Sequence, residues 1–215
     1  MTTFAVVAGV FGASLAPSII LILGFANLLA DGFSMSIGNY LGTKTQKEYI
    51  QNQRKKEEWE IDNLVEQEKD EIRDIYKEKG FKGELLYEIV WVITSRRKVW
   101  IDTMMKEELG LIEDKRRPRD TAITTFIAFN IIGLIPIVPF MFIQIFGTDM
   151  ISTTSNAFSY SVIFTAISIF LIAIIRGKIV GKGIIRTGLN TMAVGGIAAS
   201  VAYIVGYVSG EVINQ

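Results

Sequence analysis

The sequence predicts an all-α, polytopic membrane protein with five transmembrane helices, the first of them truncated, and a three-helix insert between spans two and three. Half of the residues are hydrophobic and the mean hydropathy is +0.36, although 20% are charged. The charges are concentrated, because 37 of the 44 lie within residues 44–120. The apolar stretches on both sides reach the length of about 20 residues that a bilayer requires. The sequence therefore predicts one polar insert between two membrane-spanning regions.

The predicted domains are residues 1–43, which hold the partial first helix and the second span, residues 44–120, which form the insert, and residues 121–215, which hold spans three to five. Residues 1–13 are apolar but rise only about 20 Å as a helix, against a hydrocarbon core of about 30 Å. We therefore expect half a span there. The remaining spans are predicted at residues 18–41, 121–146, 157–175 and 189–208, and the third contains Pro136 and Pro139.

Glycines and a polar break divide the insert into three predicted helices. The second span runs on into water until a break near Asp62 and Asn63. A second helix over residues 65–79 ends at Gly80, since glycine commonly follows the last helical residue. A third helix is predicted over residues 84–111, with Gly110 closing it.

The distribution of basic residues predicts the orientation in the membrane. With five spans, the insert and the loop at residues 176–186 lie on one side and carry all 22 Lys and Arg, 18 in the first and four in the second. The positive-inside rule makes that side cytoplasmic. Nothing resembles an organelle-targeting segment, so a prokaryotic cell (inner) membrane is the expected location.

The amino-acid composition also argues against several classes of function. The chain contains no Cys and no His, which removes thiolate ligands, the commonest zinc ligand and the usual general base near neutral pH. We expect no catalytic residues, no prosthetic group and no enzyme activity. The insert carries a net charge of 18 − 19 = −1, whereas a nucleic-acid partner would require a basic surplus. Any metal must be held by carboxylates, amides, carbonyls, water or Met sulfur.

Carboxylate pairs in the insert are the candidate metal ligands. Glu57 and Glu60 share a helix face at i,i+3, and a second pair repeats this spacing on the next helix. Acidic groups from three short helices repel one another unless cations lie between them, and oxygen ligands with a thioether suit Fe²⁺ or Mn²⁺. The alternative interpretation is a solvated, charged helical hairpin. The predicted metal set is Glu57, Glu60, Glu68, Glu71, Glu108, Met104 and Met105.

Asp31 is the candidate functional residue inside a membrane span. An acidic group inside a span is costly and usually marks an ion or proton path, although a helix-packing carboxylate is the alternative. Met35 stands at i+4 from it. Taken alone, Met35 would be interpreted as a packing residue.

Three segments resemble the vacuolar iron transporter family of plants and yeast. The resemblance covers essentially the whole chain and implies a homodimer with a transport path between subunits. It also implies a cytoplasmic three-helix metal-binding domain and export of Fe²⁺, often Mn²⁺ too, in exchange for protons. The family's insert glutamates and methionine pair fall on the seven residues named above, and its membrane methionine falls on Met35. The segments are NLLADGFSMSIGNYLGTK (27–44), WIDTMMKEELGL (100–111) and LIPIVPF (134–140).

Two positions depart from the family pattern. The family carries an aspartate just before a segment like TTFAVVAG, which has no counterpart here, and some members have an acidic residue where this chain has Asn27. The predicted function is a divalent metal exporter, with metal ions, protons and the lipid bilayer as partners. The alternatives are a membrane-anchored metal sensor or buffer without transport, and a structural membrane protein whose charged hairpin docks a partner.

Overall fold

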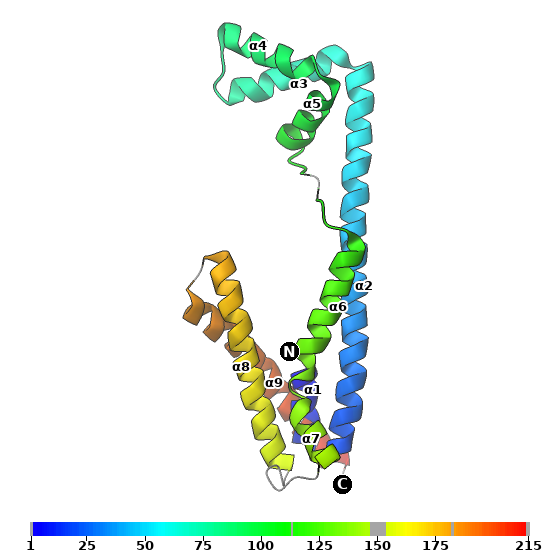
Figure 1. Cartoon of the computed structure of the whole chain (residues 1–215), viewed down its shortest axis with the longest axis vertical. Helices are drawn as coiled ribbons and strands as arrows, with labels where there is room; N and C mark the ends of the chain where they lie inside the picture. The colour runs from blue at the N-terminus through cyan, green and yellow to red at the C-terminus, as the bar shows by residue number, and fades with distance from the viewer. Residues whose placement is uncertain (1, 113, 147–153, 182, 214–215) are drawn as a thin grey trace. The chain divides into compact units, whose positions relative to one another are not determined.

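The computed structural model describes residues 2–112, 114–146, 154–181 and 183–213, and these are helical with no strand. The chain divides into two units (Figure 1). The first comprises Met1–Ile37 and Ala122–Gln215, and the second comprises Gly38–Thr121. Helix α2 (Pro17–Asn63) contributes residues to both. The prediction of an all-α protein with membrane-spanning helices is confirmed.

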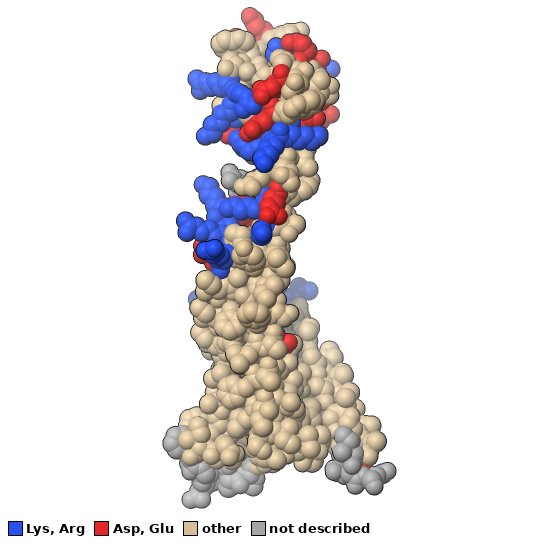
Figure 2. Space-filling view, turned by 90° about the vertical axis from the view of Figure 1, so that its right-hand side faces the viewer, with Lys and Arg blue, Asp and Glu red and all other residues tan. Residues whose placement is uncertain are grey.

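Helices α2, α8 (Thr154–Val180) and α9 (Ile184–Ile213) are each long and apolar enough to cross a membrane. A fourth span results if α6 (Pro118–Leu134) and α7 (Val138–Phe146) are counted together. Helix α1 (Thr2–Gly12) is apolar but has only 11 residues. The described residues thus give three spans, or four with the bent pair. Figure 2 shows the Lys, Arg, Asp and Glu side chains gathered on the surface of the insert.

The third predicted span is not one straight helix, because α6 and α7 meet at a bend of 59°. Pro136 and Pro139 have no N–H to donate to the carbonyls one turn earlier, so the helical ladder is interrupted there. The Ser161 hydroxyl of α8 donates a hydrogen bond of 2.7 Å to the Pro136 carbonyl. A neighbouring helix therefore satisfies a backbone group that the break releases, as a low-dielectric environment requires.

Helices α1 and α9 pack backbone to backbone through small residues. A side chain at Gly206 would overlap the carbonyl of Gly9, and one at Gly210 would lie 2.9 Å from the Cα and carbonyl oxygen of Ala13. Close approach of this kind supplies the van der Waals contact that holds helices together in lipid.

We predict that Gly206→Ala lowers the free energy of unfolding by about 1–3 kcal/mol, because the added methyl group forces α1 and α9 apart. Gly196→Ala is the matched control, since a methyl group at that position of the same helix meets nothing within 4 Å. The measurement is the thermal midpoint of the purified protein in detergent. Equal midpoints for the two variants would contradict the close packing.

The insert contains α3 (Val65–Glu78), α4 (Gly83–Thr94), α5 (Arg97–Thr103) and a π-helical turn, η1 (Met104–Glu108). Their shared core takes one or more residues from each of these helices and from the second part of α2. It consists of Ile50, Ile61, Ile72, Leu86, Val90, Ile93, Trp100, Ile101, Met104 and Met105. Gly80 and Gly110 follow helix ends with φ of +98° and +63°, as the sequence predicted.

The prediction of one continuous third helix in the insert was wrong. Thr94 and Ser95 turn their hydroxyls back onto the carbonyls of Val90 and Val92, each at 2.9 Å. Side chains of this kind compete with the helical ladder for backbone groups. Arg96 then takes an extended conformation with φ −125° and ψ 100°. The chain therefore changes direction here, and α5 starts as a separate helix.

Candidate metal site in the insert

The structure brings glutamates from three elements into one electrostatic cluster. Glu57 and Glu60 come from α2, Glu68 and Glu71 come from α3, and Glu108 comes from η1. The negative charge of Glu108 acts on Glu57 and on Glu68, although 51 and 40 residues separate them along the chain. We call these five residues the glutamate cluster.

Glu57 and Glu68 form the buried part of the glutamate cluster. Each residue is only 2% exposed, and Oε2 of each carboxyl group has no hydrogen-bond partner among the described residues. A buried carboxylate oxygen without a partner is costly, since desolvation is not compensated. The two carboxyl groups therefore favour either a proton or a bound cation.

Burial and mutual repulsion raise the pKa values in the glutamate cluster. Burial raises the pKa of Glu57 to about 7, and the charges of Glu108 and Glu60 add to it. Burial likewise raises the pKa of Glu68 to about 7, with further contributions from Glu71 and Glu57. Partial burial, followed by the charges of Glu71 and Glu60, raises the pKa of Glu108. Near neutral pH the cluster thus holds protons that a cation could displace.

Two outer members of the glutamate cluster have partners. Lys56 Nζ lies 3.1 Å from Glu60 Oε1, and Gln67 Nε2 donates a hydrogen bond of 3.1 Å to Glu71 Oε1. Within the described ranges, no three acidic side chains converge closely enough to hold a metal ion as they stand. The cluster is therefore an open arrangement, and metal binding would require side chains to rotate inward.

Glu107 shows that sequence neighbours in η1 have different environments. It pairs with Lys79, the residue that follows α3, and lies 3.3 Å from Lys106 Nζ. The hydrogen bond from Lys79 is the main reason that the pKa of Glu107 is lowered. Glu108, one residue later, has its pKa raised. A π-helical turn changes the angle between successive side chains, and such turns are frequent at functional sites.

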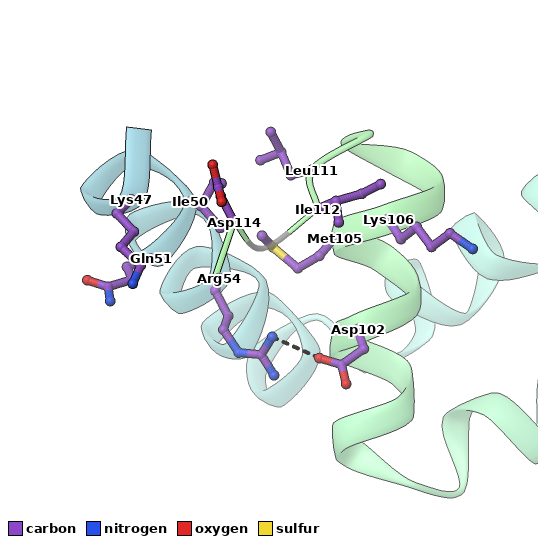
Figure 3. A pocket seen from close by; sticks show the side chains of 10 residues that line it. All are labelled: Lys47, Ile50, Gln51, Arg54, Asp102, Met105, Lys106, Leu111, Ile112 and Asp114. Carbon is purple, nitrogen blue, oxygen red and sulfur yellow. Dashed lines mark ion pairs between the residues drawn. The ribbon is translucent and has the colours of Figure 1, made fainter. Parts of the chain in front are cut away.

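Met104 and Met105 are both buried in the core of the insert. Met105 also lines a pocket between α2 and η1, into which its side chain extends (Figure 3). The sequence predicted both methionines alongside the glutamates. The structure places them on η1, which also carries Glu108.

Asp31 and Met35 belong to the other unit, on the part of α2 that precedes Gly38. Asp31 is partly buried and has no ion pair among the described residues, whereas Met35 is 50% exposed on this single chain. Gly32, between them, faces Asn130 and Phe129 of α6. Asp31 and Met35 are one turn apart, so they lie close together along the helix.

Sequence reasoning missed the ion pairs that hold α5 against α2. Arg97 binds both oxygens of Asp62, at 3.1 and 2.8 Å, and Arg54 lies 2.8 Å from Asp102. Hydrogen bonding to Arg97 lowers the pKa of Asp62. These pairs join residues 35 and 48 positions apart, for which helical spacing gives no signal. They position η1 by fixing the helix that leads into it.

Membrane-spanning helices together with a carboxylate-rich insert define the chain as a helical integral membrane protein with a candidate site for divalent cations. Residues 1–207 match the model of the VIT family, and the chain belongs to this family. The resemblance found in the sequence is therefore confirmed.

The alignments with named relatives cover most of the chain. It is 34% identical to a protein named vacuolar iron transporter from Toxoplasma gondii over 96% of the chain and 69% of that protein. It is 33% identical to a vacuolar iron transporter from Centaurea cyanus, over 93% of the chain and 79% of the relative. The vacuolar iron transporter of Plasmodium falciparum is 31% identical over 100% of the chain and 80% of its own length.

Proposed function

We propose that this protein transports a divalent metal ion, Fe²⁺ or Mn²⁺, out of the cytoplasm in exchange for protons. The glutamate cluster gathers the ion, with Met104 and Met105 as softer ligands. Asp31 and Met35 lie on the path through the membrane. The relatives named vacuolar iron transporter support iron as a cargo.

One observation carries the proposal: two buried carboxylate oxygens, from Glu57 and Glu68, have no partner among the described residues, and the pKa of each group is about 7. Such a site binds protons at low pH and a cation at higher pH, because metal must displace protons from its ligands. Oxygen ligands favour Mn²⁺ and Fe²⁺, and a thioether shifts the preference towards the softer ion.

The proposal also includes the orientation of the protein in the membrane, the membrane in which it lies and its assembly as a homodimer. With five spans, all 22 Lys and Arg fall on the insert's side, which supports a cytoplasmic insert, and a prokaryotic cell membrane is the proposed location. The exposure of Met35 on a single chain supports a homodimer whose transport path runs between the two copies. Metal entering from the insert's side would then leave on the opposite side.

We predict that reconstituted protein moves Fe²⁺ into liposomes with an acidic lumen, and that Met35→Leu slows this flux about tenfold or more by removing the sulfur ligand. Leucine preserves the volume of methionine, so the fold is expected to tolerate the change. Met192→Leu on α9 is the matched control. The measurement is the initial rate of quenching of a metal-sensitive dye in the lumen, with and without a pH gradient.

Each outcome of this flux experiment tests one part of the proposal. Flux that does not respond to the pH gradient would contradict proton exchange. Equal rates for Met35→Leu and Met192→Leu would remove Met35 from the path. Absence of flux in the unmodified protein, with metal binding retained, would make the chain a metal sensor or buffer.

A further inference from the structure

A pocket of about 280 Å³ lies between α2 and η1 (Figure 3). The residues that line it do not include any member of the glutamate cluster. Ile50 and Met105 form apolar walls, and Leu111 covers one side. Ile112 also lines the pocket, although it is 74% exposed. The volume lies just below the range of about 300–1,000 Å³ that is typical of pockets for drug-sized ligands. A small polar group with a few carbon atoms fits this description.

Most charges around the pocket are already paired. Arg54 lies 2.8 Å from Asp102 and 3.5 Å from Glu58, and Asp114 lies 2.7 Å from Arg116. Lys47 differs, because it forms no ion pair within the part of the chain that the structure describes. Its charge reaches Asp114, whose pKa is lowered mainly by hydrogen bonds from Arg116 and slightly by Lys47. Lys47 therefore remains able to bind an anion.

Lys47 also lies just beyond the apolar part of α2. Thr43 of α2 and Thr121 of α6 have hydroxyl oxygens 3.3 Å apart, at the point where both helices leave their apolar segments. Four residues of helix carry Lys47 about 6 Å beyond Thr43. The headgroup layer of a bilayer is about 5–7 Å deep on each side, so a membrane boundary at Thr43 would put the amine within reach of lipid phosphates. Gln51, one turn further, also lines the pocket.

We propose that this pocket binds the phosphoglycerol headgroup of an anionic phospholipid from the leaflet on the insert's side. The phosphate pairs with Lys47, and the hydroxyl groups of the headgroup enter the pocket and hydrogen-bond to Gln51. Lys47 and Gln51 stand together at one edge of the pocket (Figure 3), which allows both contacts to one headgroup. The apolar walls pack against the carbon atoms of the headgroup.

The test measures lipid binding to the full-length protein. Purified protein is titrated in detergent with short-chain phosphatidylglycerol, phosphatidic acid or phosphatidylcholine, and bound lipid is counted by native mass spectrometry. We expect phosphatidylglycerol to be retained preferentially. Lys47→Gln should weaken its binding about fivefold, which corresponds to about 1 kcal/mol for one lysine near anionic lipid. Gln51→Leu should reduce the preference for phosphatidylglycerol over phosphatidic acid, because only the former offers headgroup hydroxyl groups.

Lys77→Gln is the matched control, since this exposed lysine of α3 removes the same charge without lining the pocket. An equal loss of lipid with Lys77→Gln would overturn the proposal and indicate unspecific electrostatic attraction. Competition with soluble glycerol 3-phosphate is the second test. If it displaces phosphatidylglycerol at millimolar concentration, the pocket serves a soluble phosphate ester and the lipid assignment is overturned. If it does not, and Lys47→Gln alone weakens binding, the proposal stands.

Discussion

Replacing Glu57 and Glu68 together with glutamine will abolish most metal binding by the insert, with a loss of affinity of at least about 100-fold. Both side chains are buried, and each contributes an unpartnered carboxylate oxygen from a different helix. Glutamine keeps the shape but offers a neutral amide, so the charge that attracts a divalent ion is lost. A 100-fold change corresponds to about 2.7 kcal/mol.

The three tryptophans provide a direct measurement. All of them, Trp59, Trp91 and Trp100, lie in the insert, so intrinsic fluorescence of the full-length protein reports on this unit alone. Trp100 is 5% exposed and will change its emission when the core opens. Mn²⁺ at 100 times its Kd should stabilise the unmodified insert by about 2.7 kcal/mol, and the double variant should show almost no shift at the same concentration.

Glu84→Gln combined with Glu88→Gln is the control for charge alone. These two residues are exposed on α4, and neither is among the groups whose charges raise the pKa of Glu57, Glu68 or Glu108. The control variant should keep the full stabilisation by Mn²⁺. Metal stabilisation that survives in Glu57→Gln/Glu68→Gln would place the binding site elsewhere in the chain.

Helical spacing in the sequence was sufficient to predict the pairs within each helix, because i and i+3 share a face. It also predicted that α2 ends near Asn63, and the structure ends the helix at that residue. The approach of Glu108 to the other helices was a hypothesis from charge and from the family resemblance. The structure explains it through the core of the insert, in which Trp100, Ile101 and Met104 are buried together with residues of α2, α3 and α4. Contacts of this kind join distant residues and leave no local pattern in the sequence.

The departures from prediction come from backbone effects with weak sequence signals. Thr94 and Ser95 are compatible with a helix interior, and only their hydroxyl contacts to the backbone reveal a helix end. Pro136 and Pro139 are tolerated in membrane-spanning helices, so their presence did not predict a bend of 59°. At the bend, the Ser161 hydroxyl of α8 donates a hydrogen bond to the Pro136 carbonyl, a contact between distant residues that no local pattern reveals.

The metal-free insert should lose stability as the pH rises from 5 to 8, by on the order of 3 kcal/mol. Glu57 and Glu68 have a folded-state pKa of about 7, above the ordinary value of 4.5. Acids with a raised pKa bind protons more strongly when folded. Their contribution is therefore complete below pH 4.5 and is lost as the pH rises through 7. Groups with a lowered pKa, such as Asp62, act in the acidic range and leave this window unaffected.

Denaturant unfolding followed by tryptophan emission at pH 5, 6, 7 and 8 measures this dependence. Glu57→Gln/Glu68→Gln should give a nearly flat profile and exceed the unmodified protein in stability at pH 8, because glutamine cannot acquire a charge. Mn²⁺ should restore the stability of the unmodified protein at pH 8. It should have little effect on stability at pH 5, where protons occupy the same oxygens. Stability that rises with pH in the metal-free protein would contradict the buried, proton-binding state of the two carboxyl groups. The opposite responses to pH and to metal follow from one cause, since a proton and a cation compete for the same two buried oxygens.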